Sequence, residues 1–251
     1  MAKIIELFGL PGSGKSFLAH ALSTAFAENN ITVLQLPEAV KLCLQRKDDS
    51  LFTSLFKKLP FAIWHRIIHE HYCLPELMDF SSEHIELTSF YHKNLQQSNS
   101  STQTIRNVIG AFTMSCVERQ LIDRYSRDDE LILVDEGFCH RCFTLYGNLR
   151  ISYTKEDVQQ YVTLLPHCHG AIFVATSPDI SIARMKSRNR FPELLATQTD
   201  TTMLEILQHG FSLLDQITME LDRQEVACYR YDGHSADLEP LRCFCLHSFN
   251  I

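Results

Sequence analysis

The eight residues GLPGSGKS, at positions 9 to 16, constrain the fold more than any other stretch of this chain. Their spacing satisfies the pattern G-x-x-x-x-G-K-S/T, an apolar run (4–8) leads into them, and a run with helical spacing (15–29) follows. In that context successive backbone N–H groups and the N-terminus of the helix surround an anionic phosphate. An ordinary glycine-rich turn is the alternative, but the Lys-Ser pair, both glycines and both flanks favour a phosphate-binding loop.

The residue types in the loop predict which phosphate-bearing molecule binds there. Lys15 is expected to reach the β- and γ-phosphates of a nucleoside triphosphate, and Ser16 is expected to bind Mg²⁺. The expected cofactors are therefore ATP and Mg²⁺. The residues expected to bind the nucleotide are Gly9, Leu10, Pro11, Gly12, Ser13, Gly14, Lys15, Ser16 and Phe17.

Five short apolar runs rich in β-branched residues alternate with stretches of helical spacing, at 3–8, 31–36, 131–135, 171–176 and 226–231. Buried strands that alternate with helices indicate an α/β fold, with a mostly parallel five-stranded sheet between two layers of helices. No internal repeat or long linker divides the chain. We therefore expect a single domain over residues 1–251.

The interval between the second and third strands is unusually long and has mostly helical spacing. Residues 50–78 are expected to form helical pieces broken at Pro60 and Pro75, because an interior proline loses a hydrogen bond and clashes with the preceding turn. Residues 101–126 are expected to form one long helix that begins at a Ser or Thr cap. The sheet is therefore predicted to carry a helical insertion between strands 2 and 3.

We expect residues 41–126 to cover the end of the sheet at which a phosphate acceptor enters, since ligands of such folds bind beyond the carboxyl ends of the strands. Four aromatic residues in this region have near-helical spacing: Phe52, Phe56, Phe61 and Trp64. They are either core residues or an aromatic clamp for a planar acceptor base.

Carboxylates follow two of the predicted strands. Asp135 and Glu136 end the third strand, where Asp135 is expected to hold Mg²⁺ and Glu136 to orient or deprotonate an acceptor hydroxyl. A structural cap for the next helix is the alternative for Asp135. Glu38 follows the second strand and is a second candidate base, because the ends of neighbouring parallel strands converge on one crevice. A solvated or capping role for Glu38 stays open.

A basic cluster follows the fourth strand and consists of Arg184, Lys186, Arg188 and Arg190. Such a cluster suits a lid, at about 184–198, that neutralises transferring phosphates. A solvated charged face is the alternative. In an acidic chain, the local excess of arginine after a sheet strand favours the functional interpretation.

Three motifs together resemble P-loop kinases of the thymidylate kinase and deoxynucleoside kinase group, within the P-loop NTPase superfamily. They are GLPGSGKS, the strand-borne DEG (135–137), and a strand-PD-helix unit followed by RxxxRxR. The resemblance covers roughly residues 1–40 and 128–240. It implies a parallel sheet, ATP·Mg²⁺ on the loop, and lid arginines that close over the transferred group.

Position by position, the resemblance implies roles for individual residues. Phosphate binding falls to Gly12, Gly14 and Lys15, magnesium binding to Ser16 with Asp135, and transition-state neutralisation to Arg184, Arg188 and Arg190. PEAV (37–40) is similar to a PEPV-like stretch of the group, which implies that Glu38 is the base. The chain departs from the group where DEG replaces a Glu-Arg-Ser or Asp-Arg motif, and where Phe17 replaces a threonine. Arg141 is a candidate substitute for the missing arginine.

Composition limits the partners of the protein. The formal net charge of −7 argues against non-specific nucleic-acid binding, and no apolar run reaches the length needed to cross a bilayer. The start of the chain is not a signal peptide, so we expect a cytoplasmic protein. Nine scattered cysteines fit a reducing compartment without structural disulfides, and the Cys and His clusters lack the paired spacing of a zinc site.

The sequence therefore predicts an ATP-dependent kinase that transfers the γ-phosphoryl group to a small-molecule acceptor, first of all a nucleoside or nucleotide. A non-nucleoside acceptor, such as a sugar or other alcohol, and an NTPase switch that acts on a protein partner remain alternatives. The oligomeric state is left open, with a homodimer as one alternative. The predicted catalytic residues are Lys15, Glu38, Asp135, Glu136, Arg184, Arg188 and Arg190.

Overall fold

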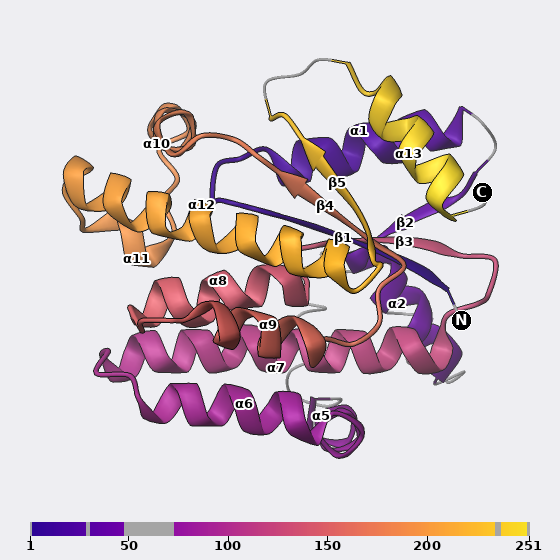
Figure 1. Ribbon diagram of the computed structural model, residues 1–251. Coiled ribbons are helices and arrows are strands. Elements are labelled where there is room, and N and C mark those ends of the chain that lie inside the picture. Colours follow the sequence, from indigo (N-terminus) through magenta and orange to yellow (C-terminus); the bar gives the residue numbers. More distant parts are fainter. Residues whose placement is uncertain (1, 29–30, 48–72, 234–236, 250–251) are drawn as a thin grey trace.

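The computed structural model describes residues 2–28, 31–47, 73–233 and 237–249. Its centre is a five-stranded sheet in the order β2-β3-β1-β4-β5, and every pair of neighbouring strands is parallel (Figure 1). The strands are β1 (Lys3–Gly9), β2 (Val33–Gln35), β3 (Leu131–Asp135), β4 (Gly170–Val174) and β5 (Ala227–Tyr231). All five predicted strands are confirmed, and so is the α/β class.

Burial explains why the central strands are continuous apolar runs. Six of the seven residues of β1 and all five residues of β4 are buried. Helices cover both faces of a parallel sheet, so successive side chains on either face enter a core. The edge strands β2 and β5 are less buried, which agrees with their more polar composition.

Helices form one layer on each side of the sheet (Figure 1). On one side, α1 (Lys15–Ala27) and α13 (Glu239–Phe249) contact the sheet through a core that includes Leu18, Leu22 and Phe26. On the other side, α8 (Phe138–Leu149) and α12 (Asp200–Arg223) contact the central strands, and α9 (Lys155–Thr163) packs against both. The larger core cluster lies on this second side.

The predicted helical insertion between strands 2 and 3 is confirmed. Its described helices are α2 (Leu36–Lys47), α5 (Cys73–Glu83), α6 (Ile85–Gln96) and α7 (Thr102–Tyr125). Helix α7 begins as predicted, because the hydroxyl of Ser101 accepts a hydrogen bond from the backbone N–H of Thr104. It contacts α2, α5 and α8, and therefore ties the insertion to the sheet-bearing part of the molecule.

Two prolines mark helix starts in the insertion. Pro75 lies in the first turn of α5, where a helix needs no backbone N–H, so the predicted break there is a helix beginning. Pro37 lies in the first turn of α2, which starts directly after β2 at Leu36. The second strand is accordingly shorter than the predicted 31–36. The predicted break at Pro60, and the aromatic residues Phe52, Phe56, Phe61 and Trp64, lie outside the described residues.

The segment after β4 holds the basic cluster. It consists of α10 (Pro178–Ser187), the short α11 (Glu193–Ala196) and the start of α12. The eight cysteines whose side chains the structure describes have free thiols. None of the described helices is both long enough and apolar enough to span a membrane.

Candidate functional site

The loop between β1 and α1 depends on its glycines. Gly12 and Gly14 have φ angles of 80° and 103°, in the left-handed region that L side chains rarely adopt. A Cβ atom on Gly12 would lie 2.7 Å from the carbonyl oxygen of Ser181 on α10. Gly9 is equally restricted, because its Cβ would lie 2.8 Å from the carbonyl oxygen of Val174. The loop is therefore held tightly between α1, β4 and α10.

Lys15 is buried at the first position of α1, and its ammonium group faces back into the loop. Its Nζ donates to the carbonyl oxygens of Gly9 and Leu10, at 3.1 Å each. The same atom lies 3.2 Å from Oε1 of Glu136. These contacts place the charge of Lys15 inside the loop and against the carboxyl end of β3.

Ser16 and Asp135 meet as the sequence predicts. The hydroxyl of Ser16 donates to Oδ2 of Asp135 at 2.6 Å, which links the start of α1 to the end of β3. The other carboxylate oxygen, Oδ1, is buried and has no hydrogen-bond partner among the described residues. Burial raises the pKa of Asp135, while the nearby charge of Lys15 and the hydrogen bond from Ser16 lower it.

These oxygens fit Mg²⁺. The ion is a hard cation that prefers oxygen ligands, and proteins commonly bind it through one or two carboxylates together with substrate phosphates and water. Asp135 has a carboxylate oxygen without a partner, and the hydroxyl of Ser16 lies beside it. In the described part of the chain, no group of three or more His, Cys, Asp and Glu residues is arranged to hold a metal.

Glu136 lies beside Asp135 in a strained backbone conformation. Its φ is 65°, in the left-handed region, and its N–H donates to the carbonyl oxygen of Leu7 at 3.1 Å. Such strain in a non-glycine residue is common at functional sites. The conformation directs the carboxylate toward Lys15, and Oε1 also lies 3.8 Å from Nε2 of His140.

The electrostatic surroundings keep Glu136 ionised. Its pKa is lowered to about 2 by the charge of protonated His140, and further by Lys15 and Arg141. Burial lowers the pKa of His140 itself to about 3, so this imidazole is neutral at neutral pH. The positive charges that face Glu136 there are consequently those of Lys15 and Arg141.

Glu38 makes no hydrogen bond or ion pair with this cluster among the described residues, and Arg141 acts on it through its charge alone. Glu38 lies in the first turn of α2, is exposed, and accepts a hydrogen bond from the backbone N–H of Gln35 at 3.2 Å. This contact is the capping interaction that the sequence left open. Arg141 projects from α8 toward α7, where its Nε donates to the hydroxyl of Ser115 at 2.8 Å.

The three predicted arginines have different surroundings. Arg184 donates to the carbonyl oxygen of Ser13 at 2.8 Å and to that of Gly233 at 2.9 Å. These hydrogen bonds link the loop to α10 and to the segment that follows β5. Arg188 and Arg190 are exposed. They line a cavity of about 400 Å³ together with the loop, Glu136 and residues that include Phe17, Phe191 and Pro192.

Two residues of the site escaped prediction. Thr176 is fully buried, and its hydroxyl donates to the carbonyl oxygen of Ser13 at 2.8 Å. Its place just after β4, at the carboxyl end of a central strand, is a signal that sequence alone supplies. His140 is placed against Glu136 by the turn into α8, and the spacing of four residues between them is a signal that the sequence supplies.

Comparisons with known proteins give two solved structures that align over nearly the whole chain. One is deoxyadenosine kinase from M. mycoides, with 14% sequence identity, a TM-score of 0.46, and 98% of each chain covered. The other is thymidylate kinase from Ehrlichia chaffeensis, with 9% identity, a TM-score of 0.38, and 100% of this chain and 99% of that chain covered. No family model and no curated protein matches the sequence.

Proposed function

We propose that the protein is an ATP-dependent kinase that transfers the γ-phosphoryl group of ATP to a small-molecule acceptor, a nucleoside or nucleotide. One observation supports this most directly: Lys15, the Ser16–Asp135 pair and Glu136 converge on a glycine loop that opens into a cavity with two exposed arginines. Phosphoryl transfer needs mainly positioning and charge neutralisation, which these groups supply.

The donor half uses the loop and two residues that follow it. Backbone N–H groups of the loop and the N-terminus of α1 bind the phosphates, since both present partial positive charge. Lys15 exchanges its contacts with the carbonyls of Gly9 and Leu10 for phosphate oxygens. Ser16 and Asp135 would hold Mg²⁺, which would supply positive charge to neutralise the phosphates.

A nucleoside acceptor must lose the proton of its hydroxyl during transfer, whereas the phosphate of a nucleotide acceptor attacks through an oxygen that is already ionised at neutral pH. The bond between the γ-phosphorus and the β,γ-bridging oxygen breaks, its electron pair stays on the departing ADP, and a new bond forms to the acceptor oxygen. The proton of a nucleoside hydroxyl passes to a carboxylate. Glu136 is engaged in an ion pair with Lys15, so it serves better as the partner that positions Lys15, and Glu38 is the carboxylate that we propose as the base.

The three arginines of the predicted lid have different roles in the proposed reaction. Arg188 and Arg190 face the cavity from the predicted lid and neutralise charge on the transferred group. Arg184 holds the loop through the carbonyl oxygen of Ser13, so it acts on the loop's shape. This division supports a lid over residues 184–198. Its first residue, Arg184, is fixed to the loop, and the arginines that face the cavity follow it.

The test is release of ADP from ATP·Mg²⁺ with a panel of nucleosides, nucleoside monophosphates, sugars and other alcohols. Lys15→Ala should abolish acceptor-dependent turnover while the circular dichroism spectrum stays unchanged. The matched control is Lys155→Ala, an exposed lysine at the start of α9, which should keep full activity.

Three results would contradict the proposal. Full activity of Lys15→Ala removes the assigned role of the loop. Turnover only with sugars or simple alcohols replaces the acceptor class. Slow hydrolysis that no small acceptor changes, but that a protein stimulates, favours the NTPase switch.

A further inference from the structure

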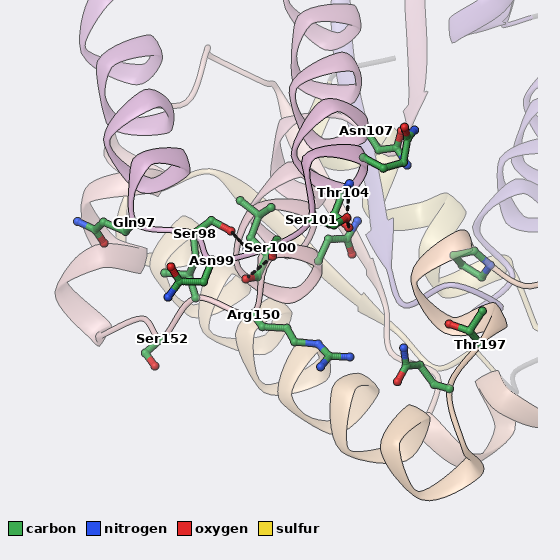
Figure 2. Close-up of a pocket in the computed structure, with 16 residues that line it drawn as sticks. Gln97, Ser98, Asn99, Ser100, Ser101, Thr104, Asn107, Arg150, Ser152 and Thr197 are labelled. Atoms are coloured by element: carbon green, nitrogen blue, oxygen red, sulfur yellow. Dashed lines mark hydrogen bonds between the residues drawn. The ribbon is translucent and has the colours of Figure 1, made fainter.

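A second cleft lies beside the candidate active site, on the far side of the predicted lid. Its volume is about 970 Å³, more than twice that of the loop cavity. Three segments far apart in sequence form it: residues 97–107, which connect α6 to α7 and begin α7, residues 148–152 at the end of α8, and Pro192 with 197–198 of the lid segment (Figure 2). Pro192 lines both cavities, so the lid segment is their common wall.

The lining of this cleft is polar but almost uncharged. Thirteen of its sixteen residues are polar, and the three apolar ones are Leu149, Ile151 and Pro192. None of the sixteen carries a carboxylate or an aromatic ring, although the chain as a whole has a net charge of −7. The lining contains six carboxamides, Gln97, Asn99, Gln103, Asn107, Asn148 and Gln198, and six hydroxyls, Ser98, Ser100, Ser101, Thr104, Ser152 and Thr197.

Arg150 carries the single charge of the lining. Its side chain extends into the space between the Ser100–Ser101 connection and Thr197 (Figure 2). It is exposed, and the structure gives its guanidinium no hydrogen bond or ion pair within the described residues. Its backbone is left-handed, with φ 52° and ψ 39°, at the C-cap of α8, where glycine is the usual residue. Arg150 therefore has a strained backbone at the position from which its guanidinium extends into the cleft.

Hydrogen bonds hold the walls of the cleft together. The hydroxyl of Ser100 donates to the carbonyl oxygen of Leu149 at 3.0 Å, which joins the α6–α7 connection to the end of α8. The hydroxyl of Ser98 accepts from the N–H of Ser100 at 3.1 Å, and Ser101 caps α7. The cleft is therefore a built feature of the described fold, in which the connecting segment has fixed partners.

We propose that this cleft binds a small, anionic, polyhydroxylated molecule without an aromatic ring, a sugar phosphate or a sugar acid. Carboxamides and hydroxyls both donate and accept, so they match the neighbouring hydroxyl groups of a sugar. Arg150 pairs with the phosphate or carboxylate through two parallel hydrogen bonds. A nucleobase instead favours an apolar or aromatic plane, which this lining lacks.

This site goes beyond the proposed kinase reaction, because it lies across the lid from the phosphate-binding loop. A ligand in the cleft contacts Thr197 and Gln198, and the same lid segment reaches the loop cavity through Pro192. The cleft and the loop cavity are therefore adjacent but separate sites, with Pro192 as the residue that they share.

The test is isothermal titration calorimetry of the full chain, without ATP, against ribose 5-phosphate, glucose 6-phosphate, glycerol 3-phosphate and gluconate. At least one of these should bind, and ribose and inorganic phosphate should each bind at least tenfold more weakly. Arg150→Gln should weaken binding at least tenfold. Arg106→Gln, an exposed arginine of α7 outside the lining, is the matched control and should bind as the wild type does.

Lys15→Ala separates this proposal from the proposed function, because the variant should lose turnover and keep binding in the cleft. The proposal is overturned if none of the four probes binds, or if Arg150→Gln and Arg106→Gln bind equally well. Tighter binding of a nucleoside monophosphate than of every probe, lost in Arg150→Gln, also overturns the assigned ligand class. Comparison of phosphorylated probes with gluconate distinguishes phosphate from carboxylate recognition.

Discussion

The loop cavity and the polar cleft lie on two sides of one lid segment, and they treat charge in opposite ways. At the base of the loop cavity opposite charges are paired and a carboxylate is hydrogen-bonded: Lys15 faces Glu136, and Ser16 donates to Asp135. In the cleft a single charge, that of Arg150, lies among neutral amides and hydroxyls. The first arrangement is suited to reorganising charge during a reaction, and the second to holding a ligand by its outline and one anionic group.

The largest effect is expected from the backbone of the loop. Gly12→Ala introduces a Cβ atom 2.7 Å from the carbonyl oxygen of Ser181 at a φ of 80°. We expect a loss of about 2–3 kcal/mol in the free energy of unfolding and loss of measurable ATP binding, because steric overlap and backbone strain add. Urea denaturation and calorimetry with an ATP analogue measure the two quantities.

The control for this substitution is Gly110→Ala on α7, where an added Cβ meets no atom within 4 Å. Alanine is a better helix former than glycine, so this variant should gain up to about 1 kcal/mol. If Gly12→Ala kept normal stability and ATP affinity, the loop would not be a rigid element. Rigidity would then not distinguish the loop cavity from the polar cleft.

The second-largest effect is expected at Asp135, the proposed ligand of Mg²⁺. Asp135→Asn keeps the shape of the side chain but removes its charge, so turnover at saturating ATP should fall by about 100-fold, which is about 3 kcal/mol in activation free energy. The Mg²⁺ concentration that gives half-maximal rate should rise. ADP release measured across a Mg²⁺ titration tests both.

Asp179→Asn, at the exposed start of α10, is a control outside the loop cavity and should change neither quantity. An unchanged Mg²⁺ requirement in Asp135→Asn would mean that the buried, unpartnered Oδ1 is not a metal ligand.

Much of the donor side follows from local sequence. The five strands, the loop and the cap of α7 depend on residues close together in the chain, and the structure confirms each of them. Ser16 and Asp135 meet because β1, which leads into the loop before Ser16, is the neighbour of β3, which ends at Asp135. Arg184 shows what local sequence does not predict. Helical spacing places it near the loop, but its hydrogen bond to the carbonyl oxygen of Gly233 depends on the path of the chain after β5.

The cleft could not be predicted from the sequence, and the reason is physical. Its walls come from residues 97–107, 148–152 and 192–198, and no periodic pattern relates these segments. Arg150 occupies a left-handed position that sequence patterns assign to glycine. The left-handed φ of Glu136 is equally unpredictable, since it depends on the hydrogen bond to the carbonyl of Leu7 on the neighbouring strand.

A smaller effect should reveal, through pH, the positive charges that face Glu136, those of His140 when protonated and of Lys15. The pKa of Glu136 is lowered from 4.5 to about 2, so its ionised form stabilises the folded state above pH 4.5. That contribution is lost as pH falls from 4.5 toward 2. The Glu136 side chain is 43% exposed, so solvent screening reduces the effect to about 1 kcal/mol.

The difference in unfolding free energy between wild type and Glu136→Gln should therefore be about 1 kcal/mol at pH 6 and shrink at pH 3. Glu156→Gln, an exposed position at the start of α9, provides the reference for non-specific acid effects. A difference that stays constant across this range would show that Glu136 is not held ionised by its neighbours.

The smallest expected effect is the sharpest test of the cleft, because it separates stability from binding. Arg150→Gly relieves the left-handed strain of a non-glycine residue, at the cost of a more flexible unfolded chain, so we expect a gain of about 0.5 kcal/mol in unfolding free energy. The same variant should lose sugar-phosphate binding, since the guanidinium is gone. Glu225→Gly, at a similar φ of 61° after α12, should gain comparable stability and bind normally. If Arg150→Gly lost stability instead, the arginine would be a structural residue of the α8 terminus, and its strain would not be evidence for a ligand site.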